Sequence, residues 1–288
     1  MKSKKQMILL LAIATLFAAC GGSDDEAVTP ALQPQPQRML TVEVSERPMQ
    51  TEGGAKAPRR AGGATTTETL NTFRMCTHVS GSIWSEELTK TAGKWTTKWP
   101  SSSEEKYKFY AYNVGSENEF VWNGGDPYVS FTMEEEVANQ KDFLVAKTAE
   151  AKSYSETGGK VSLTFDHACA AVQFYVFKEE NATYVVKEIK LLHVNKQGDY
   201  HFSSNTWSNI STPANFTLTT GEITPSDSKQ LLLKGWLYVI PQSKEGMQLQ
   251  IKYTKDGGTE KTMLIDLSDL SVSWEAGYQY TVNIKIGK

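Results

Sequence analysis

Short segments in which apolar and polar residues alternate recur along most of this chain, and this pattern constrains the fold more than any other feature. A period of two places one side of an extended strand on a core and the other side in solvent. The alternating segments are Leu40–Val44, Phe73–Val79, Tyr107–Ala111, Val161–Phe165, Val172–Val176, Ile189–Leu191, Met247–Tyr253 and Tyr278–Ile286, with apolar runs at Phe143–Ala146 and Leu231–Ile240. Helical periodicity is weak, and residues 133–142 are the best candidate for a short helix. Many short strands separated by turn residues predict an all-β protein built of antiparallel sandwiches.

A polar stretch, Ser153–Lys160, lies between two groups of these segments. Its sequence, SYSETGGK, contains turn formers without apolar alternation, which is typical of a boundary. The 288 residues of the chain are enough for two ordinary domains, each with its own core. We therefore expect two β-sandwich domains in tandem, over residues 40–155 and 160–288, with a first strand at residues 40–44 and an exposed loop at residues 45–65.

Residues 1–19 form a separate element that predicts export. A basic start precedes the apolar run Met7–Ala19, which is too short to cross a bilayer and ends in small residues, as a signal peptide does. Cys20, placed directly after Ala18 and Ala19, resembles the cysteine of a bacterial lipobox, although Phe17 stands where leucine is usual. The motif implies cleavage between Ala19 and Cys20 and lipid attachment at Cys20. An ordinary secretory signal cut near Ala19 is the alternative.

Residues 20–39 have the composition of a flexible tether. An acidic run, Gly21–Glu26, follows the lipobox cysteine, and the next residues, Ala27–Gln37, are rich in proline and glutamine. Neither stretch has a pattern that could bury apolar surface. We expect an extended spacer that separates the lipid from the folded part of the chain.

Net charge and cysteine content exclude two classes of protein. The formal net charge is -3 and no block of lysine or arginine stands out, so the chain lacks the basic footprint that nucleic acid binding needs. With Cys20 lipidated, Cys76 and Cys169 remain, and two cysteines do not make a disulfide framework. They could form one bridge in an oxidising compartment, but two free, buried thiols are the favoured interpretation.

The ionisable residues show no pattern typical of a catalytic or metal site. The histidines, which lack the close spacing of metal ligands, are His78, His167, His193 and His201. In a strand, His167 and Cys169 share one face and Asp166 lies on the other, so they do not form a nucleophile–base pair with an orienting carboxylate. Acidic runs at Glu134–Glu136 and Glu179–Glu180 are typical of solvated surface. We predict no enzyme, cofactor or metal; a cleft with carboxylates converging near His167 would argue otherwise.

Tryptophan content leaves a binding function open. Rings of exposed tryptophan stack on sugars, whereas most tryptophans of a sandwich lie in its core or at its rim. The seven candidates are Trp84, Trp95, Trp99, Trp122, Trp207, Trp236 and Trp274. An exposed coplanar row of these rings would favour a surface protein that binds glycan.

Three stretches together resemble the fimbrillin family of Bacteroidetes, the subunits of type V pili and their relatives. They are QKDFLVAKT at Gln140–Thr148, GKVSLTFDHACAAVQFYV at Gly159–Val176 and WEAGYQYTVNIKIGK from Trp274. The resemblance covers residues 20–288. It implies two transthyretin-like antiparallel β-sandwich domains in tandem, and the acidic run after Cys20 is similar to those that direct Bacteroidetes lipoproteins to the outer face of the outer membrane. Independently of the family, Gly277 suits a turn into the last strand and Trp274 suits the end of a sandwich.

The resemblance also implies assembly by strand exchange. In polymerising members an arginine-specific protease removes the N-terminal segment, and a strand of another subunit fills the groove that this opens. Here the displaced strand would carry Leu40, Val42 and Val44. The arginines of the chain are Arg38, Arg47, Arg59, Arg60 and Arg74. Arg59 and Arg60 lie in a loop rich in glycine and proline, where proteolysis is easy, so we expect cleavage after Arg60. The alternative is that these two arginines are only charged residues of a linker.

One departure from the family pattern concerns the role in the filament. Stalk subunits have extra strands after the W-x-x-G-x-x-Y motif to donate to a neighbour, whereas only residues 281–288 follow it here. The resemblance thus implies a tip or minor subunit of a surface fimbria that acts in adhesion to a host or bacterial ligand. The alternative is an uncleaved outer-membrane lipoprotein that binds glycan or a host ligand and does not polymerise.

Overall fold

The computed structural model describes residues 38–51, 70–114, 118–219, 221–268 and 273–287, all within one compact unit. Four of the residues singled out above, Ala19, Cys20, Arg59 and Arg60, lie outside these ranges. Within them no helix has the length and apolar character needed to cross a membrane. Strands account for nearly all the regular structure of the described residues, so the all-β prediction is confirmed.

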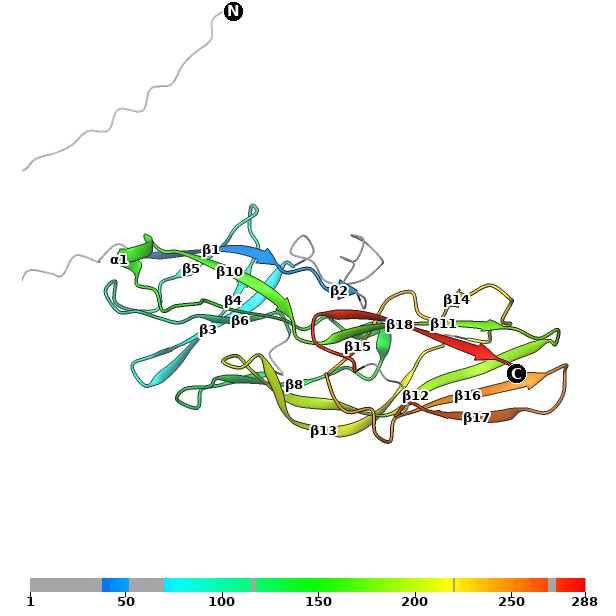
Figure 1. Cartoon of the computed structure of the whole chain (residues 1–288). Coiled ribbons are helices and arrows are strands. Elements are labelled where there is room, and N and C mark those ends of the chain that lie inside the picture. The colour runs from blue at the N-terminus through cyan, green and yellow to red at the C-terminus, as the bar shows by residue number, and fades with distance from the viewer. Residues whose placement is uncertain (1–37, 52–69, 115–117, 220, 269–272, 288) are drawn as a thin grey trace, which may run out of the picture. The chain divides into compact units, whose positions relative to one another are not determined.

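A seven-stranded sheet contains the N-terminal strand and most of the first half of the chain (Figure 1). Its spatial order is β4-β3-β6-β9-β10-β1-β5. The bounds are β1 (Met39–Glu46), β3 (Thr72–Val79), β4 (Ser82–Thr89), β5 (Trp95–Lys98), β6 (Tyr110–Tyr112), β9 (Leu144–Lys147) and β10 (Lys160–His167). Alternation is clearest in β10, where Val161, Leu163 and Phe165 are buried and the residues between them are not. Every second side chain of β10 therefore faces a core.

Two further sheets carry the second half of the chain. The first has the order β14-β11-β18-β2, with β15 also paired to β11; the bounds are β2 (Gln50–Thr51), β11 (Ala170–Lys178), β14 (Gln230–Leu231), β15 (Leu237–Val239) and β18 (Tyr278–Ile286). The second has the order β17-β16-β12-β8-β7, with β13 also paired to β12; the bounds are β7 (Glu119–Val121), β8 (Tyr128–Thr132), β12 (Tyr184–His201), β13 (Thr206–Thr217), β16 (Gln248–Lys255) and β17 (Lys261–Asp266).

Three strand pairs of the described residues run parallel, so the expectation of purely antiparallel sheets is wrong. They are β1 with β10, β11 with β18, and β2 with β18. Each pair joins strands that are far apart in the sequence, and a long connection allows either direction, whereas a tight turn joins only antiparallel neighbours. Two of the three pairs involve the N-terminal residues 39–51.

The buried side chains form two clusters. The first core gathers Leu40, Val42, Phe73, Phe109 and Phe165, among others, from the seven-stranded sheet. The second core is larger and combines residues of β11, β12, β16 and β18 with others from β7 to β9. Because β7 and β8 pair with each other and β8 pairs with β12, residues 119–132 join the sheet of the second half.

Helical structure in the described residues is limited to two short turns. The candidate at residues 133–142 forms only one 3₁₀ turn, η1 (Val137–Asn139), because its chain folds back as an extended loop on both sides. A single α-helical turn, α1 (Tyr154–Thr157), lies in the stretch for which the sequence predicted a boundary. Ser153 and Glu156 cap it reciprocally, and Gly158 ends it in the left-handed conformation.

Candidate functional site

The N-terminal strand β1 lies inside its sheet rather than at an edge. On one side Thr41–Glu46 pair in parallel with Lys160–Phe165 of β10, and on the other Met39–Val42 pair antiparallel with Trp95–Lys98 of β5 (Figure 1). Among the described strands β5 has no other neighbour in the sheet order. Removal of β1 would therefore leave backbone donors and acceptors of both neighbours without their partners.

The inward face of β1 fills part of the first core. Leu40 is fully buried, Val42 is 3% exposed, and Val44 packs against the same cluster. The strand predicted from these three residues is thus present as β1. Burial of one such side chain contributes roughly 1.5–3 kcal/mol, so the strand is tied to the core by apolar contacts as well as by backbone hydrogen bonds.

The same segment continues into the second core. After β1 the chain passes through Met49, which is buried in that core, and forms β2. The backbone N–H of Gln50 donates to the carbonyl of Gly277 at 2.8 Å, and Gln50 and Thr51 lie opposite Tyr278 and Gln279 of β18. Residues 38–51, called the N-terminal segment below, therefore take part in both cores, although the sequence predicted a loop from residue 45 onward.

A buried ionic cluster lies at the end of β1. The side chain of His167 is 2% exposed; its Nδ1 lies 2.6 Å from Oδ2 of Asp142 and its Nε2 lies 3.1 Å from Oε1 of Glu46. The Asp142 side chain is completely buried, and that of Glu46 is 10% exposed. These three residues, called the His167 cluster below, join β1, β10 and the loop before β9.

Electrostatics favour a protonated histidine in this cluster. Burial alone would lower the pKa of His167, but hydrogen bonding to Asp142 and Glu46 and their negative charges outweigh it and raise the pKa to about 9. Burial raises the pKa of Asp142, and the neighbouring His167 counteracts that rise. Both directions place a proton within the cluster at neutral pH.

Carboxylates do converge near His167, but the geometry is not that of an active site. Two pockets lie among the described residues near this part of the fold, and neither is lined by a member of the His167 cluster. A substrate has no path to the imidazole while β1 is in place. The arrangement instead ties the strand to the protein.

A glycine makes close contact with the start of β1. The carbonyl of Gly159 accepts a hydrogen bond from the N–H of Thr41 at 2.7 Å. Gly159 has a φ of +80°, and a Cβ built there would lie 2.2 Å from the carbonyl oxygen of Met39 and 2.7 Å from the ring of Tyr154. Only glycine permits this approach. The residues around the N-terminal segment, Trp95–Lys98, Asp142, Gly159–His167 and Gly277–Gln279, are called the β1 site below.

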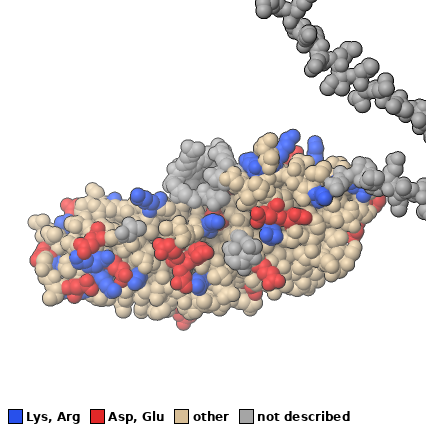
Figure 2. Space-filling view, turned by 180° about the vertical axis from the view of Figure 1, so that it is seen from behind, with Lys and Arg blue, Asp and Glu red and all other residues tan. Residues whose placement is uncertain are grey.

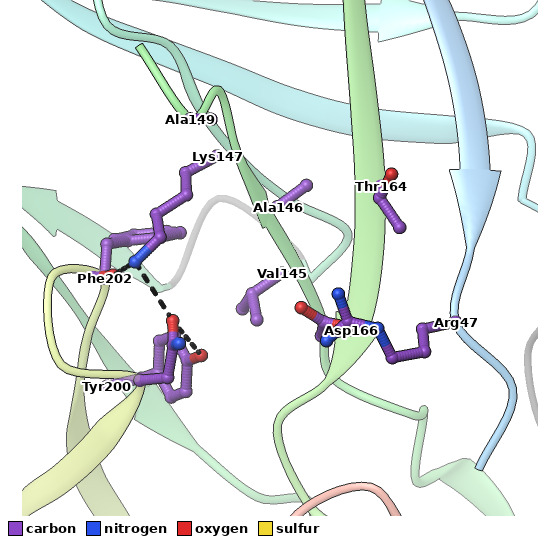
Figure 3. A pocket seen from close by; sticks show the side chains of 10 residues that line it. Arg47, Val145, Ala146, Lys147, Ala149, Thr164, Asp166, Tyr200 and Phe202 are labelled. Carbon is purple, nitrogen blue, oxygen red and sulfur yellow. Dashed lines mark hydrogen bonds and ion pairs between the residues drawn. The ribbon is translucent and has the colours of Figure 1, made fainter.

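A small pocket of about 230 Å³ borders the β1 site (Figure 3). Arg47 and Asp166 point toward each other across its rim and form an ion pair of 2.9 Å between exposed side chains. On the opposite side Lys147 Nζ donates to the carbonyl of Phe202 and to Oδ1 of Asn205. Each of these three charged side chains thus already has a partner within the protein.

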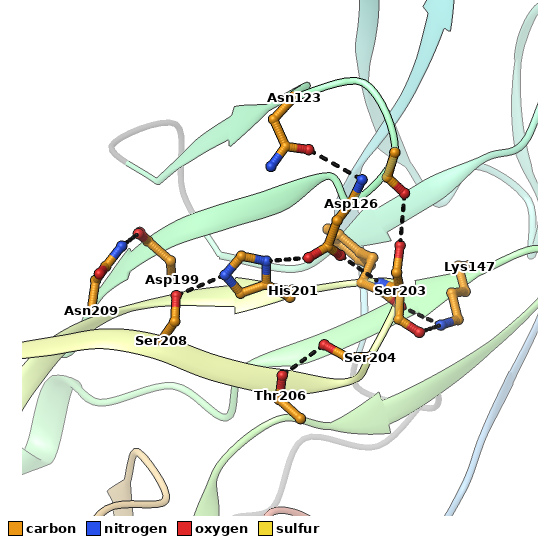
Figure 4. A network of polar contacts seen from close by, with 12 residues as sticks. Asn123, Asp126, Lys147, Asp199, His201, Ser203, Ser204, Thr206, Ser208 and Asn209 are labelled. Atoms are coloured by element: carbon orange, nitrogen blue, oxygen red, sulfur yellow. Dashed lines mark hydrogen bonds and ion pairs between the residues drawn. The ribbon is translucent and has the colours of Figure 1, made fainter.

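A second polar network joins β8, β12 and β13 (Figure 4). His201 contacts Asp126 Oδ2 through Nδ1 and Ser208 Oγ through Nε2, each at 2.7 Å. Asp126 also accepts from the N–H of Ser203 at 3.2 Å. This order of groups occurs in hydrolases, but Ser208 lines neither of the two pockets just mentioned. The network fixes the loop before β8 against the β12–β13 turn.

The other ionisable candidates have structural partners. His78 stacks on Trp122 with ring centroids 4.7 Å apart, and His193 Nδ1 lies 3.0 Å from the carbonyl of Gly246. Of the acidic runs, Glu135 pairs with Lys196, Glu179 with Lys285 and Glu180 with Lys255. The described residues contain no group of three or more His, Cys, Asp or Glu that could hold a metal ion. On the face drawn in Figure 2, basic and acidic side chains are interspersed.

Both remaining cysteines are free and buried, as the favoured interpretation predicted. Cys169 does not extend β10 but lies in the turn between β10 and β11, so it does not share a strand face with His167. Burial raises the pKa of Cys76 to about 11 and that of Cys169 well above its ordinary value. Neither thiol is placed to act as a nucleophile.

The tryptophans form no exposed platform. All seven belong to the described residues; Trp95, Trp99, Trp236 and Trp274 are buried and Trp84, Trp122 and Trp207 are half-buried. Trp207 also donates through Nε1 to the carbonyl of Ala168 at 2.8 Å. These rings therefore serve packing, and the structure gives no support to sugar binding by a row of tryptophans.

Solved structures with the same fold come from Bacteroides. A fimbrial protein of Bacteroides vulgatus ATCC 8482 has a TM-score of 0.54 at 18% identity over 86% of this chain and 95% of its own. A candidate cell adhesion protein of Bacteroides uniformis ATCC 8492 has a TM-score of 0.53 at 16% identity over 89% and 95% of the two chains. A candidate cell adhesion protein of Bacteroides eggerthii DSM 20697 has a TM-score of 0.51 at 16% identity over 89% of this chain and 88% of its own. At these identities the likeness shows the fold.

Sequence comparison assigns the family. The comparison with curated proteins gave no match. The model of a family described as fimbrillin-like matches residues 61–288, a range that begins directly after Arg60 and leaves the N-terminal segment outside. This match confirms the resemblance drawn from the three sequence stretches. The chain belongs to the fimbrillin-like family, whose members are structural proteins rather than enzymes.

Proposed function

We propose that this chain is a subunit of a cell-surface fimbria that accepts a strand from another subunit in place of its own N-terminal segment. It reaches the outer membrane as a lipoprotein modified at Cys20, and an arginine-specific protease then cuts after Arg60. The cut separates the lipidated residues 20–60 from the folded part. Two transthyretin-like sandwich domains in tandem complete the proposal, with β10 assigned to the first domain and β7 and β8 to the second.

The observation that carries this proposal is the position of the N-terminal segment in both cores. Leu40 and Val42 are buried in the first core and Met49 in the second, while the backbone of the segment pairs with β5, β10 and β18. Loss of the segment would expose apolar surface and unpaired backbone groups in the β1 site. Such an edge is completed when an extended strand of another chain binds to it.

The position of the arginines fits this use. β2 ends at Thr51 and β3 begins at Thr72, so a cut after Arg60 falls between two paired strands. Cleavage there breaks the covalent link between the N-terminal segment and β3. The segment could then leave only by exchange, because its noncovalent contacts remain.

The role in the filament is proposed to be that of a tip or minor subunit. Eight of the nine residues of β18 are paired with β11, from Gln279 opposite Ala171 to Ile286 opposite Lys178. Only the first residue of the strand is not. This strand is used within its own sheet and is not free to fill the β1 site of a neighbour. A subunit that accepts a strand and donates none ends a filament, where its outer surface could meet a host or bacterial ligand.

The test uses cells that express the full chain with both Arg59 and Arg60 changed to alanine, and Arg38→Ala as the matched control. Fimbriae are sheared from the cells and examined for the protein with a specific antibody. The double variant is expected to stay with the cells in its lipidated form, and the control to be found in the sheared fraction. Recovery of the double variant in sheared fimbriae at the control level would contradict the proposal.

A further inference from the structure

The inward face of β1 departs from an apolar pattern at one position. Leu40, Val42 and Val44 face the first core, and the same alternation turns the next inward side chain, that of Glu46, toward the interior. A carboxylate at such a position is costly unless it meets a positive charge or hydrogen-bond donors. Its presence shows that the β1 site contains a feature that matches a carboxylate.

That feature is His167. The imidazole Nδ1 contacts Asp142, which belongs to the body of the protein, whereas Nε2 lies 3.1 Å from the carboxylate of Glu46 in the N-terminal segment, an ion pair without a well-aligned hydrogen bond. If the segment leaves, Asp142 remains in place and only the partner of Nε2 is lost. The empty β1 site would therefore present a charged ring that has lost one of its two carboxylate neighbours, next to the position that Glu46 occupied.

Most side chains at this position would not match the site. An apolar side chain would leave the charged ring with one carboxylate neighbour instead of two, and a lysine or arginine would meet a like charge. Aspartate would be shorter by one methylene group. Glutamine would supply an acceptor without the charge.

We propose that the β1 site selects an incoming strand that carries a glutamate at the position of Glu46, opposite Phe165 of β10. The proposal rests on the proposed function, since it requires that another strand enters this site. The partner is an extended segment with apolar residues at the positions of Leu40, Val42 and Val44, glutamate at the fourth inward position, and an apolar residue three places later, where Met49 enters the second core.

A second copy of this chain offers no such strand in β18. Its apolar residues Tyr280, Val282 and Ile284 are followed at the fourth alternate position by Ile286. This strand would bring an aliphatic side chain to His167. β18 of a second copy is therefore not the selected strand, and we take the partner to be a different subunit whose donated strand has the glutamate.

The test measures competition by peptides on the wild-type protein, so that no variant of the protein has to fold. The full chain is cut with an arginine-specific protease, the protease is inhibited, and a fluorescent peptide with the sequence of residues 38–51 is added in excess. Its binding is followed by anisotropy. Unlabelled peptides then compete: the native sequence, Glu46→Gln, Glu46→Leu and Glu46→Lys, with Glu43→Gln as the control because Glu43 is exposed on the outer face.

The native and Glu43→Gln peptides are expected to compete within about twofold of each other. Loss of a buried ion pair should weaken the Glu46→Leu and Glu46→Lys peptides by about 10- to 100-fold, and the Glu46→Gln peptide by an intermediate factor. The Glu46→Ile peptide models Ile286, the fourth alternate residue of β18. It should compete as weakly as the Glu46→Leu peptide.

Three results would overturn the inference, and they differ in whether strand exchange itself is also refuted. Equal competition by the native and Glu46→Leu peptides would refute selection of glutamate and leave strand exchange standing. Failure of the native peptide to enter the cut protein would refute strand exchange and selection together. A second readout uses the His167→Leu protein, which should bind the Glu46→Leu peptide at least as tightly as it binds the native peptide. If this variant still prefers the native peptide, the role of His167 is refuted.

Discussion

The carboxylate of Glu46 lies 3.1 Å from Nε2 of His167, although one residue ends the N-terminal strand and the other ends β10. Asp142 holds the other ring nitrogen at 2.6 Å, so a strand proposed to be removable is tied to the protein by a buried ion pair. Parallel pairing of β1 with β10 makes this possible, because it brings the final inward residues of both strands to the same end of the sheet.

Stability should depend on pH through His167. Its pKa is raised from 6.5 to about 9, so its contribution to the free energy of unfolding is fully present below pH 6.5 and is lost as the pH rises through about 9. Glu46 and Asp142 contact it, and Cys169 and Tyr238 lie near Asp142; burial raises the pKa values of Asp142, Cys169 and Tyr238. Denaturant unfolding at pH 6 and pH 9.5 should show a loss of about 2–3 kcal/mol in the wild-type protein. A loss of the same size in His167→Leu would contradict this origin.

Replacement of His167 by leucine should destabilise the protein at neutral pH by about 3 kcal/mol, because it leaves two carboxylates buried without a cation. His78→Leu is the matched control, since His78 is half-buried and stacks on Trp122, and it forms no ion pair with another described residue. The control should cost about 1 kcal/mol or less. Urea unfolding followed by circular dichroism measures both. Equal losses would show that the ionic cluster has no special role.

Gly159 and its neighbour Gly158 provide a paired test of the contact with β1. Both have positive φ, so alanine at either position costs about 1 kcal/mol of backbone strain. Only at Gly159 would the added Cβ meet the carbonyl of Met39, at 2.2 Å. Gly159→Ala should therefore lose a further 1–3 kcal/mol and make β1 more accessible to hydrogen exchange. Similar exchange rates of residues 39–46 in the two variants would argue against this contact.

Both Cys76 and Cys169 should be unreactive in the folded protein, because each is fully buried and burial raises its thiol pKa. Alkylation with iodoacetamide followed by mass spectrometry should show no label on either cysteine without denaturant. Addition of denaturant, without a reductant, should allow labelling of both. A requirement for reductant would show that the two thiols are joined after all.

The sequence predicts β1 only in part. The alternation of Leu40, Val42 and Val44 predicts a strand, but a charged side chain is normally assigned to the surface, so Glu46 falls in the loop predicted for residues 45–65. The cation that makes its burial possible comes from a residue far along the chain. Asp142 was likewise assigned to a helix candidate, whereas it is completely buried beside His167. Such partners depend on sheet order, which alternation within one segment does not contain.

Several strands escaped prediction for a different reason. In β4, β13 and β17 most side chains are exposed or half-buried, so apolar residues do not mark one face. β10 and β18 were found because alternate residues enter a core. Periodicity identifies a strand through its burial, and strands that are held mainly by backbone pairing lack that signal.

The N-terminal mass of the protein extracted from sheared surface fimbriae tests the central claim most directly. The account predicts a mature chain that begins at Ala61, with residues 38–51 absent and a strand of another subunit in the β1 site. A chain that retains Leu40–Val44 and the lipid on Cys20 in the assembled fimbria would contradict it.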